Sequence, residues 1–424
     1  MKQDDFEIEG TTLVKYLGND EKVIVPEGIE VIGKGAFIKA KNIISVVLPA
    51  SVKIIEESAF VHCENLASIN IPCGVKVIAD STFMNCYSLN NIFLPDTVTE
   101  IEGFAFSGCK SLDSFHISEN VTEIGRYSFE CTPWKRRQGK NFPIVGDGVL
   151  FACPKNLKNL IIPYGVKHVP AILVDAIQQT EFIQIPETVV SISKYFLQSH
   201  HLREFSVAEN NPNYCSIDGV LYSKDKKTLI FYPPNRTETI FEIPDTVEII
   251  EERAFLYADR LKTIIIPESV KKFSNYTFCE GAQLQFKGQW DGFTLPILDS
   301  WKFTRIEQFL NRMQSPSFET FMNIRNKYCQ LYFALYLYQK SKDERYPQIV
   351  FDSIDYTVKF LVAPEQINLL AQFLECEFFS TEQIDYILEK AIEQKGENTE
   401  VVLLLLEYKN QHSGYIAPEE RFKL

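Results

Sequence analysis

The chain has 424 residues, 45% hydrophobic and 23% charged, so it is typical of soluble proteins in composition and too long for one ordinary compact core. Its formal net charge is −13 at pH 7, so it lacks the excess of Lys and Arg that binding to nucleic-acid phosphates requires. The longest strictly apolar run, residues 401–406, is far shorter than a membrane-spanning helix. These properties predict two structural units and argue against nucleic acid or a membrane as the main partner.

The first 21 residues predict an N-terminal cap. They open on an acidic segment without the apolar stretch of a signal peptide, which indicates a cytoplasmic protein. Gly10 then begins a strand-like segment that leads to residues 22–25. Related segments begin at Gly148 and Gly219, and each predicts a hairpin of a Gly-initiated strand, a polar turn and a return strand. We expect the first hairpin to cap the chain at residues 1–21, and the others to lie in longer coils inserted near residues 132–158 and 209–238.

Residues 22–131 repeat one pattern at an interval of 23 residues. The repeated positions include prolines and phenylalanines: Pro26, Pro49, Pro72, Pro95, Phe37, Phe60, Phe83, Phe106 and Phe129. In one unit, the alternation over residues 68–71 predicts a short strand with Ile69 and Ile71 inward and Ser68 and Asn70 outward. Pro72 lacks an N–H and ends the strand. A period of about 20 to 50 residues that fixes several positions at once is typical of a solenoid.

Each unit must stack on its neighbours, because the few apolar side chains of one unit cannot offset the backbone entropy that is lost on ordering it. Cys63, Cys86 and Cys109 share one repeat position, and Cys131 stands one residue short of it. We expect these thiols to stack on successive turns as small buried side chains rather than to form disulfides. The sequence contains no Cys-x-x-Cys pair, so a zinc site is not expected.

One pattern in the repeat resembles a known family. The pattern Leu-x-x-Ile-x-Ile-Pro-x-x-Val-x-x-Ile runs from Leu66 to Ile78 and follows Phe60 and Cys63. It resembles the leucine-rich repeats of the bacterial BspA-like type, over residues 23–286. The resemblance implies a right-handed solenoid with a parallel sheet on one side, and protein or surface binding as the usual role.

The repeat is interrupted beyond residue 131 and then resumes. Pro163 and Pro186 are again 23 residues apart, as are Pro244 and Pro267, and residues 202–208 supply a strand position without its proline. About eleven strand positions, at ~4.8 Å each, give a sheet roughly 50 Å long. We therefore assign the leucine-rich-repeat solenoid to residues 22–287. Residues 288–297, which include Trp290, break the pattern and are expected to form a junction.

Residues 298–424 predict an all-α helical-repeat domain, because the apolar residues change to a spacing of three and four. We expect helices at residues 298–313, 316–339, 347–362, 364–375, 381–394 and 399–411. Residues 328–338 are apolar or aromatic on nearly every side, which predicts a central helix rather than an interface. Ser380 and Gln383 have the spacing of a capping box. The helix pairs are similar to ankyrin-like repeats but lack the Thr-Pro-Leu-His signature of that family.

An enzyme would need converging side chains such as a nucleophile with a base, paired carboxylates or metal ligands. His200 and His201 form the densest histidine cluster, but they precede a strand at a corner where solvated side chains are expected. Residues 146–148 are interpreted as a hairpin turn and not as a phosphate-binding loop, because no helix follows. The basic residues 135–137, with Lys140, are interpreted as a solvated loop. We predict that the protein is not an enzyme and has no catalytic residue, metal, cofactor or small-molecule substrate.

The outward side chains of the strands form the candidate site. A solvated face would be uniformly polar, whereas this one interleaves large apolar residues with small polar ones, as protein-binding surfaces do. The candidate residues are Val47, Asn70, Asn91, Phe93, His116, Ile161, Phe182, Gln184, Glu204 and Ile265. Alternatively, the apolar members support sheet packing or are covered by the inserted coils.

These observations predict an interaction or scaffold protein that binds an unidentified protein through this face, with the helical domain as a further contact surface. The alternative is a cell-surface or secreted BspA-like adhesin that binds host or matrix proteins. That alternative requires export and an anchor.

Overall fold

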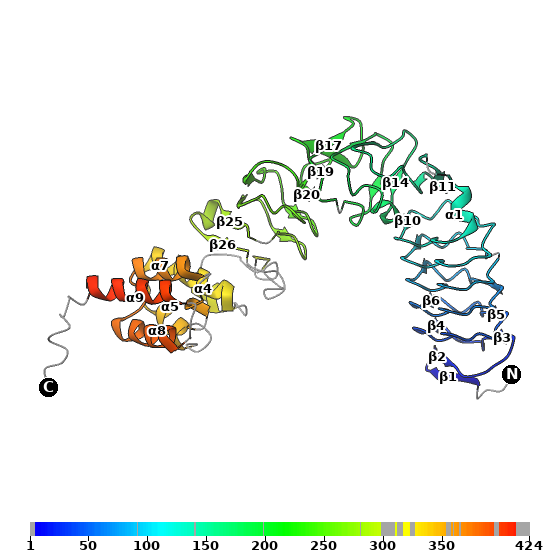
Figure 1. Cartoon of the computed structure of the whole chain (residues 1–424), viewed down its shortest axis with the longest axis horizontal. Helices are drawn as coiled ribbons and strands as arrows, with labels where there is room; N and C mark the ends of the chain where they lie inside the picture. The colour runs from blue at the N-terminus through cyan, green and yellow to red at the C-terminus, as the bar shows by residue number, and fades with distance from the viewer. Residues whose placement is uncertain are drawn as a thin grey trace. The chain divides into compact units, whose positions relative to one another are not determined.

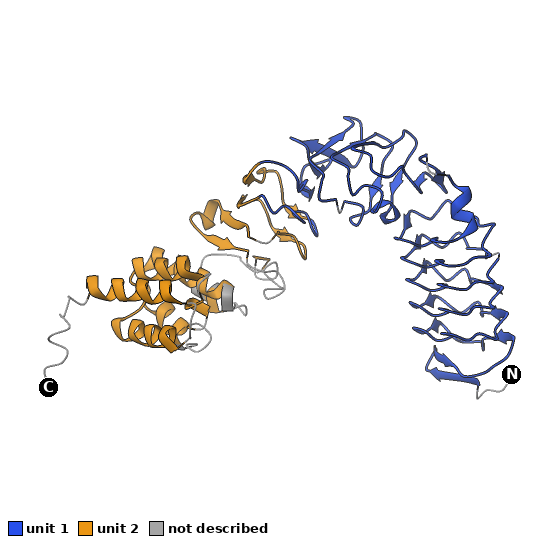
Figure 2. Cartoon of the chain, viewed as in Figure 1, with its two compact units in different colours: residues 1–237, 251–260 blue, residues 238–250, 261–424 orange. Residues whose placement is uncertain are grey.

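The structure is a computed structural model that describes residues 5–90, 92–139, 141–197, 199–279, 281–297, 310–311, 317–322, 327–352, 358, 360–363, 366–393 and 398–412. The chain divides into two compact units (Figure 2). Unit 1 consists of residues 1–237 and 251–260, and unit 2 consists of residues 238–250 and 261–424.

Unit 1 is a stack of solenoid turns that present short strands in two rows (Figure 1). The rung row contains β3 (Lys22–Ile24), β5 (Ser45–Val47), β7 (Ser68–Ile69), β13 (Asn159–Ile161), β15 (Phe182–Ile185) and β17 (Glu204–Val207). The second row contains β4 (Val31–Ile32), β6 (Ile54–Ile55), β8 (Val77–Ile78), β9 (Glu100–Ile101), β10 (Glu123–Ile124), β12 (Val149–Leu150), β14 (His168–Val169) and β16 (Ser191–Ile192). In Figure 1, β3 and β5 lie on one side of the stack, and β4 and β6 lie on the opposite side.

Strands of successive turns pair in parallel, and their register follows the repeat. In the rung row Lys22 pairs with Ser45 and Ser45 with Ser68, while in the second row Val31 pairs with Ile54. Equivalent residues in each of these pairs are one repeat apart. The predicted solenoid with parallel sheets, followed by helices, is therefore confirmed.

The repeated phenylalanines form a continuous column inside unit 1. Phe37, Phe60, Phe83, Phe106 and Phe129 are at most 1% exposed, and each ring stacks on the next with centroids 4.8–5.5 Å apart. The thiols of Cys63, Cys86 and Cys109 form a second buried column, in which each Sγ donates to a backbone carbonyl at 3.0–3.2 Å. The expectation was wrong for Cys131, which is exposed because Thr132 takes the next place in that column.

Two corners in each regular turn place residues in the left-handed region, on either side of the phenylalanine. The corner residues are Gly35, Ser58, Ser81, Phe104 and Tyr127 at the first corner, and Lys39, His62, Asn85, Gly108 and Cys131 at the second. Only two of them are glycines, although a left-handed backbone disfavours other residues. The conformation is held by the stack, since the N–H of Ser58 donates to Asp80 O and that of His62 to Met84 O in the next turn. Cys131 is thus a corner residue.

The three Gly-initiated segments form hairpins, but in the first two the turn precedes the Gly-initiated strand instead of following it. β1 (Phe6–Glu9) pairs antiparallel with β2 (Thr12–Tyr16), and β11 (Ile144–Val145) pairs antiparallel with β12. The predicted return strands at residues 22–25 and 160–162 belong instead to the rung row, through β3 and β13. The reason is that Gly10 and Gly148 have positive φ angles and lie in the turns.

The third segment forms a predicted hairpin and an additional strand. β19 (Val220–Ser223) pairs antiparallel with β20 (Thr228–Phe231) across a polar turn, as expected. β18 (Tyr214–Ile217), which the sequence did not predict, pairs antiparallel with β19 on the other side, where Gly219 is in a left-handed conformation at the turn. Both inserted segments therefore contain antiparallel strand pairs.

Unit 2 contains the last solenoid strands together with the helices. Its strands are β21 (Ile240–Glu242), β22 (Ile249–Ile250), β23 (Thr263–Ile266), β24 (Lys272–Phe273), β25 (Gln283–Phe286) and β26 (Thr294–Pro296). β26 pairs antiparallel with β25 and ends the sheet. The predicted junction is thus part of a core, because Trp290 of η3 (Gly288–Trp290) is buried and lies 5.4 Å from Phe333 between ring centroids. The division into compact units falls within the solenoid and not at residues 288–297.

The helices of unit 2 agree in type with the prediction wherever they are described. They are α3 (Phe318–Met322), α4 (Lys327–Ser341), α5 (Arg345–Asp352), α7 (Ile367–Glu375), α8 (Thr381–Glu393) and α9 (Thr399–His412). Residues 329–338 of α4 are all buried, so the prediction of a central helix is confirmed. The predictions for residues 298–309, 312–316 and 353–357 lie outside the described residues.

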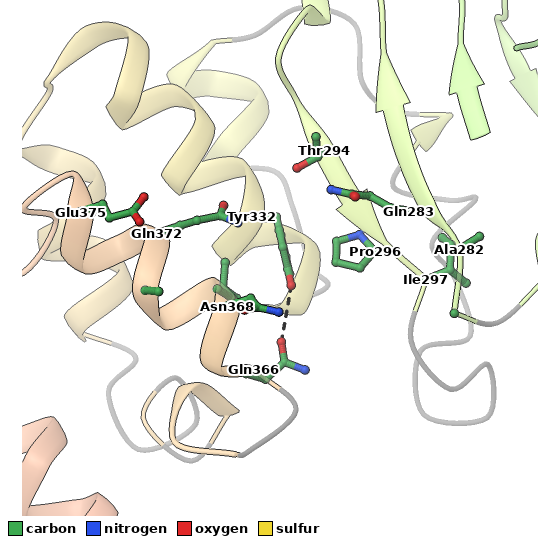
Figure 3. Close-up of a pocket in the computed structure, with 13 residues that line it drawn as sticks. Ala282, Gln283, Thr294, Pro296, Ile297, Tyr332, Gln366, Asn368, Gln372 and Glu375 are labelled. Atoms are coloured by element: carbon green, nitrogen blue, oxygen red, sulfur yellow. Dashed lines mark hydrogen bonds between the residues drawn. The ribbon is translucent and has the colours of Figure 1, made fainter. Parts of the chain in front are cut away.

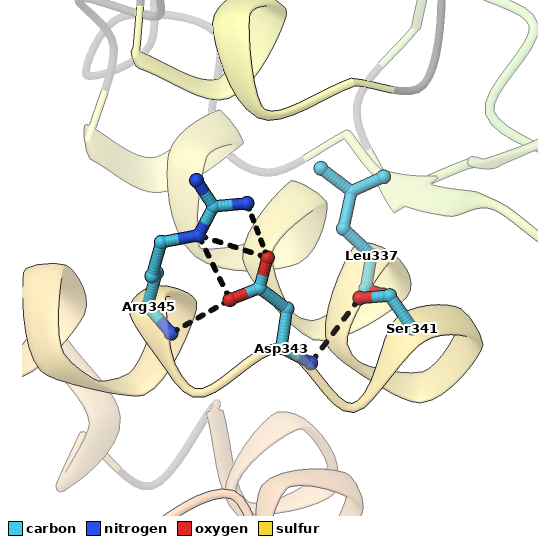
Figure 4. Close-up of polar contacts among 4 residues, drawn as sticks. All are labelled: Leu337, Ser341, Asp343 and Arg345. Atoms are coloured by element: carbon cyan, nitrogen blue, oxygen red, sulfur yellow. Dashed lines mark hydrogen bonds and ion pairs between the residues drawn. The ribbon is translucent and has the colours of Figure 1, made fainter.

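Side-chain caps define two of the helix starts. Before α8, Ser380 N donates to Gln383 Oε1 at 2.9 Å and Gln383 N donates to Ser380 Oγ at 3.3 Å, which confirms the capping box. Before α5, Asp343 accepts from the backbone N–H of Arg345 at 3.0 Å and forms an ion pair with its guanidinium at 2.6 Å (Figure 4). This carboxylate was not identified from the sequence.

Candidate functional site

The first part of the candidate face lies on β3, β5 and β7. Inward residues such as Val23 and Val46 are buried, and the outward residues next to them are exposed, with Ile24 at 60% and Val47 at 50%. The strand alternation therefore presents a pair of aliphatic side chains on adjacent strands, since Ile24 pairs with Val47. Ile24 belongs to the same column as Val47 and was not among the predicted site residues.

Phe93 and His116 continue the same column in turns that are not assigned as strands. Phe93 is 70% exposed, although Ile92 and Leu94 on either side of it are buried. His116 is exposed as well. An aromatic ring that is held between two buried anchors and turned to solvent is the most prominent apolar feature of this face.

Two polar candidates of this first part are Asn70 and Asn91. Asn70 is exposed, but its side-chain amide is engaged with the turn before it: Oδ1 accepts from Leu48 N at 2.8 Å and Nδ2 donates to Leu48 O at 2.9 Å. This amide continues the ladder where the backbone pairing of β7 stops, so its main role is structural. Asn91 lies outside the described residues.

The second part of the face lies on β13, β15 and β17. Ile161 is 59% exposed and pairs with Gln184, which is exposed too. Phe182 is half-buried between Asn159 and Glu204 on the neighbouring strands. Because Phe182 already packs along the sheet, it contributes less free apolar surface than Phe93.

Between the two parts the chain forms a short helix, α1 (Pro133–Arg137), where the sequence predicts a solvated loop. The N–H of Trp134 donates to Leu112 O at 3.0 Å, so the helix is joined to the preceding turn, and it ends at residue 137, where the 23-residue interval would start the next rung. Thr132 caps the helix by accepting from Lys135 N at 3.1 Å, and Pro133 occupies its first turn. Buried Trp134 contacts the rings of Phe129 and Phe151, which fixes the helix in place.

Two of the three basic residues of α1 form ion pairs with acidic residues that precede the helix. Lys135 forms an ion pair with Glu130 at 2.5 Å, and Arg137 forms one with Asp113 at 2.7 Å. Such exposed pairs contribute little stability individually. They engage two of the three basic residues of α1, and Lys140 lies outside the described residues.

The last candidate, Ile265, belongs to unit 2, on β23. Its side chain is half-buried, whereas Ile240 on β21 is 58% exposed. Of the two, Ile240 is therefore the more accessible apolar residue, and it was not among the predicted site residues.

Unit 1 also contains a charged cleft of about 620 Å³ on its second row. Glu123 of β10 lies in it and accepts a hydrogen bond at 2.8 Å from the N–H of Ala171, which begins η2 (Ala171–Leu173). Burial raises the pKa of Glu123 to about 7, and the neighbouring Glu100 carboxylate adds to the shift. Arg126 and Asp175 form an ion pair at 2.6 Å beside it. These contacts join the last regular turn to the coil that follows the insertion.

The remaining polar clusters have structural partners. The ring of His200 stacks on Tyr257 at 3.7 Å between centroids, and His201 Nδ1 lies 2.8 Å from Gln178 O. Asp147 lies in the hairpin turn between β11 and β12, as predicted, and pairs with Lys167 at 2.6 Å. Within the described ranges, no three His, Cys, Asp or Glu side chains converge to form a metal site.

Among the helices in the described part of the chain, none combines the length and the hydropathy that crossing a bilayer requires.

Solved structures similar to this chain are bacterial leucine-rich repeat proteins. A leucine-rich cell surface protein from Faecalibacterium prausnitzii A2-165 is 26% identical, with 70% of this chain and 76% of that chain covered and a TM-score of 0.30. The leucine-rich repeat protein of T. pallidum is 22% identical, with 46% and 81% covered and a TM-score of 0.31. The pneumococcal vaccine antigen PcpA is 18% identical, with 68% and 69% covered and a TM-score of 0.26.

The chain matches none of the curated proteins with which it was compared. The family model of the BspA-type leucine-rich repeat region matches residues 14–135, 139–224 and 227–287 in six copies, which is more than half of the chain. The match ends before the helices of unit 2. Since the matched residues include the paired rungs and the stacked phenylalanine column, the chain belongs to the BspA-type leucine-rich repeat family.

Proposed function

We propose that this protein is a non-enzymatic interaction scaffold that binds a partner protein through the rung row of unit 1. The observation that carries the proposal is the exposure of Phe93, which is 70% accessible between two buried neighbours. Val47 and Ile161 belong to the same outward column and are at least half exposed. Burying such side chains on association would release about 2 kcal/mol each, so a few of them suffice to anchor a partner.

The polar surroundings of these residues support a protein partner. Gln184 and Glu204 are exposed beside Phe182, and His116 follows Phe93 in the column. Large apolar residues at the centre and polar residues at the rim are the usual arrangement of a protein–protein interface. Asn70 lies outside this role because its amide is bound to the backbone of Leu48.

The proposal is tested by comparing two isoleucines that are exposed to a similar degree on opposite rows. Ile161 of β13 is 59% exposed on the rung row, and Ile54 of β6 is 52% exposed on the second row. We expect Ile161→Asp and Phe93→Asp to weaken capture of specific partners from a lysate of the source cell by more than about tenfold. Ile54→Asp should leave that capture unchanged, as measured by quantitative mass spectrometry.

The control separates loss of binding from loss of folding. All three substitutions place a carboxylate at an exposed, outward-facing position, so they should perturb stability to a similar, small extent. If Ile54→Asp abolished capture as strongly as Ile161→Asp, or if Phe93→Asp retained every partner, the rung row would not be the binding site.

The same face would serve a scaffold inside the cell or an adhesin outside it. The packing of three thiols against backbone carbonyls, with no bridge between them, suits a reducing compartment, and we propose a cytoplasmic location on that basis. Fractionation of source cells with an antibody against unit 1 distinguishes the two. Recovery of the protein at the cell surface would favour the adhesin.

A further inference from the structure

In unit 2, helix α7 faces the end of the β25–β26 sheet across a slot of about 610 Å³ (Figure 3). This volume is within the range of sites that bind small molecules or peptide side chains. One wall is the helix and the other is formed by β25, β26 and the residues next to them. Every residue that lines the slot belongs to unit 2.

The helix wall carries a polar stripe. Asn368, Gln372 and Glu375 are exposed and recur at spacings of four and three, so they lie on one side of α7 over about 10 Å. The opposite side of the helix, with Phe373 and Leu374, is buried in the unit. Packing therefore fixes the direction in which the stripe points.

The sheet wall presents further uncharged polar groups toward the helix. Gln283 of β25 and Thr294 of β26 extend into the slot in Figure 3. Between the walls, the hydroxyl of Tyr332 donates to Gln366 Oε1 at 3.4 Å. Polar groups thus line both sides of the slot. Apolar residues, which include Leu369 and Ile297, form the rest of the lining.

The chemistry of the lining selects against anions. Among the described residues that line the slot there is no Lys, Arg or His, and Glu375 supplies a negative charge. Side-chain amides offer one acceptor and two donors each, which matches the alternating C=O and N–H groups of a peptide backbone. The polar stripe of about 10 Å, in which Asn368 and Gln372 supply the amides, is as long as roughly three residues of extended chain.

We propose that the slot binds a short extended peptide segment without acidic side chains, held by hydrogen bonds from Asn368, Gln372 and Gln283 to its main chain. Addition of a further strand to the sheet is disfavoured here, because the last strand carries Pro296, which has no N–H to donate. The peptide is therefore recognised by side chains of the slot and not by backbone pairing with the edge strand. This site extends the proposed function to unit 2 and does not depend on the rung row of unit 1.

The test uses the full chain and a capped hexapeptide of Gly, Ala and Ser at millimolar concentration. Methyl resonances of Leu369 and Ala371, which line the slot, should shift with this peptide. They should not shift with the same peptide N-methylated at alternate residues, nor with a version that contains Asp. Equal shifts with the N-methylated peptide, no shift with any peptide, or a shift with cellobiose alone would each overturn the proposal.

Variants assign the binding to the stripe. Asn368→Leu and Gln372→Leu should weaken peptide binding roughly tenfold in calorimetry, since each removes a paired hydrogen bond. Asn410→Leu on α9, an exposed amide away from the slot, is the matched control and should bind normally. The Glu375→Gln variant should bind the peptide that contains Asp. Unfolding cannot cause such a gain of binding. Normal binding by both stripe variants would refute the assignment, and so would failure of the acidic peptide to bind Glu375→Gln.

Discussion

Replacing Phe83 by Ala tests whether the stacked phenylalanine column holds the turns of unit 1 together. Phe83 is fully buried, and its ring lies 5.5 Å from those of Phe60 and Phe106. Truncating a buried phenylalanine costs about 3–5 kcal/mol, and the loss of aromatic pairs, worth about 0.5–1.5 kcal/mol each, shifts the cost toward the upper end of that range. Since two pairs are lost, we expect the free energy of unfolding to fall by an amount near the upper end, about 5 kcal/mol.

The matched control is Phe93→Ala, the same substitution ten residues away in the sequence. Phe93 is 70% exposed, so we expect a change within about 0.5 kcal/mol. Both variants are compared with the parent protein by urea unfolding followed by far-ultraviolet circular dichroism. In a stack whose turns contact only their neighbours, the loss at Phe83 should also make the transition less cooperative. Equal destabilisation of the two variants, or a loss below about 1 kcal/mol for Phe83→Ala, would refute the column as the source of stability.

Three further predictions concern polar groups and thiols. The pKa of Glu123 is raised to about 7, so its protonated form is favoured in the folded state. Protonation of Glu123 therefore stabilises the folded state. This stabilisation is complete below the pKa of the unfolded state and is lost as the pH rises through 7. The Glu123→Gln variant should therefore lose less stability than the parent between about pH 4.5 and 7, by up to about 3 kcal/mol in urea unfolding; parallel curves would contradict this. Asn70→Ala should cost about 1–3 kcal/mol in the same assay, since buried Leu48 loses both backbone partners; an unchanged midpoint would show that the amide is dispensable. Under native conditions iodoacetamide should alkylate exposed Cys73 and Cys131 first, as peptide mass spectrometry can follow. It should spare the buried thiols, because burial raises the pKa of Cys63 and Cys109 to about 12; early labelling of either would contradict the buried column.

The repeated part of the fold was predictable because every turn meets the same neighbours. Phe60 and Phe83 occupy equivalent places, so an interval of 23 residues in the sequence becomes a stack in space. The capping box of Ser380 and Gln383 was predictable for a similar reason, since both partners lie within one helical turn. The outward direction of Val47 and Phe93 followed from the alternation of the strand.

Features outside the repeat were not predictable in this way. The turn at Gly148 was assigned to the wrong side of its strand, because a glycine can begin a strand or end a turn and local sequence does not distinguish them. Trp134 lies in the short helix α1, which the sequence did not predict, and its ring fills the space beside Phe129 and Phe151. Of these two partners, Phe151 lies outside the repeated phenylalanine positions, so the 23-residue interval does not predict its contact with Trp134.

By itself the sequence determined the solenoid, the inward and outward columns and the helical nature of the C-terminal segment, because periodic apolar residues specify which side of each element is buried. Tertiary structure decided which outward residues are accessible. It placed α1 between two parts of the rung row, engaged Asn70 with the preceding turn and brought α7 opposite β25 and β26. These outcomes depend on contacts between segments far apart in the chain, and such contacts cannot be predicted from a local sequence pattern.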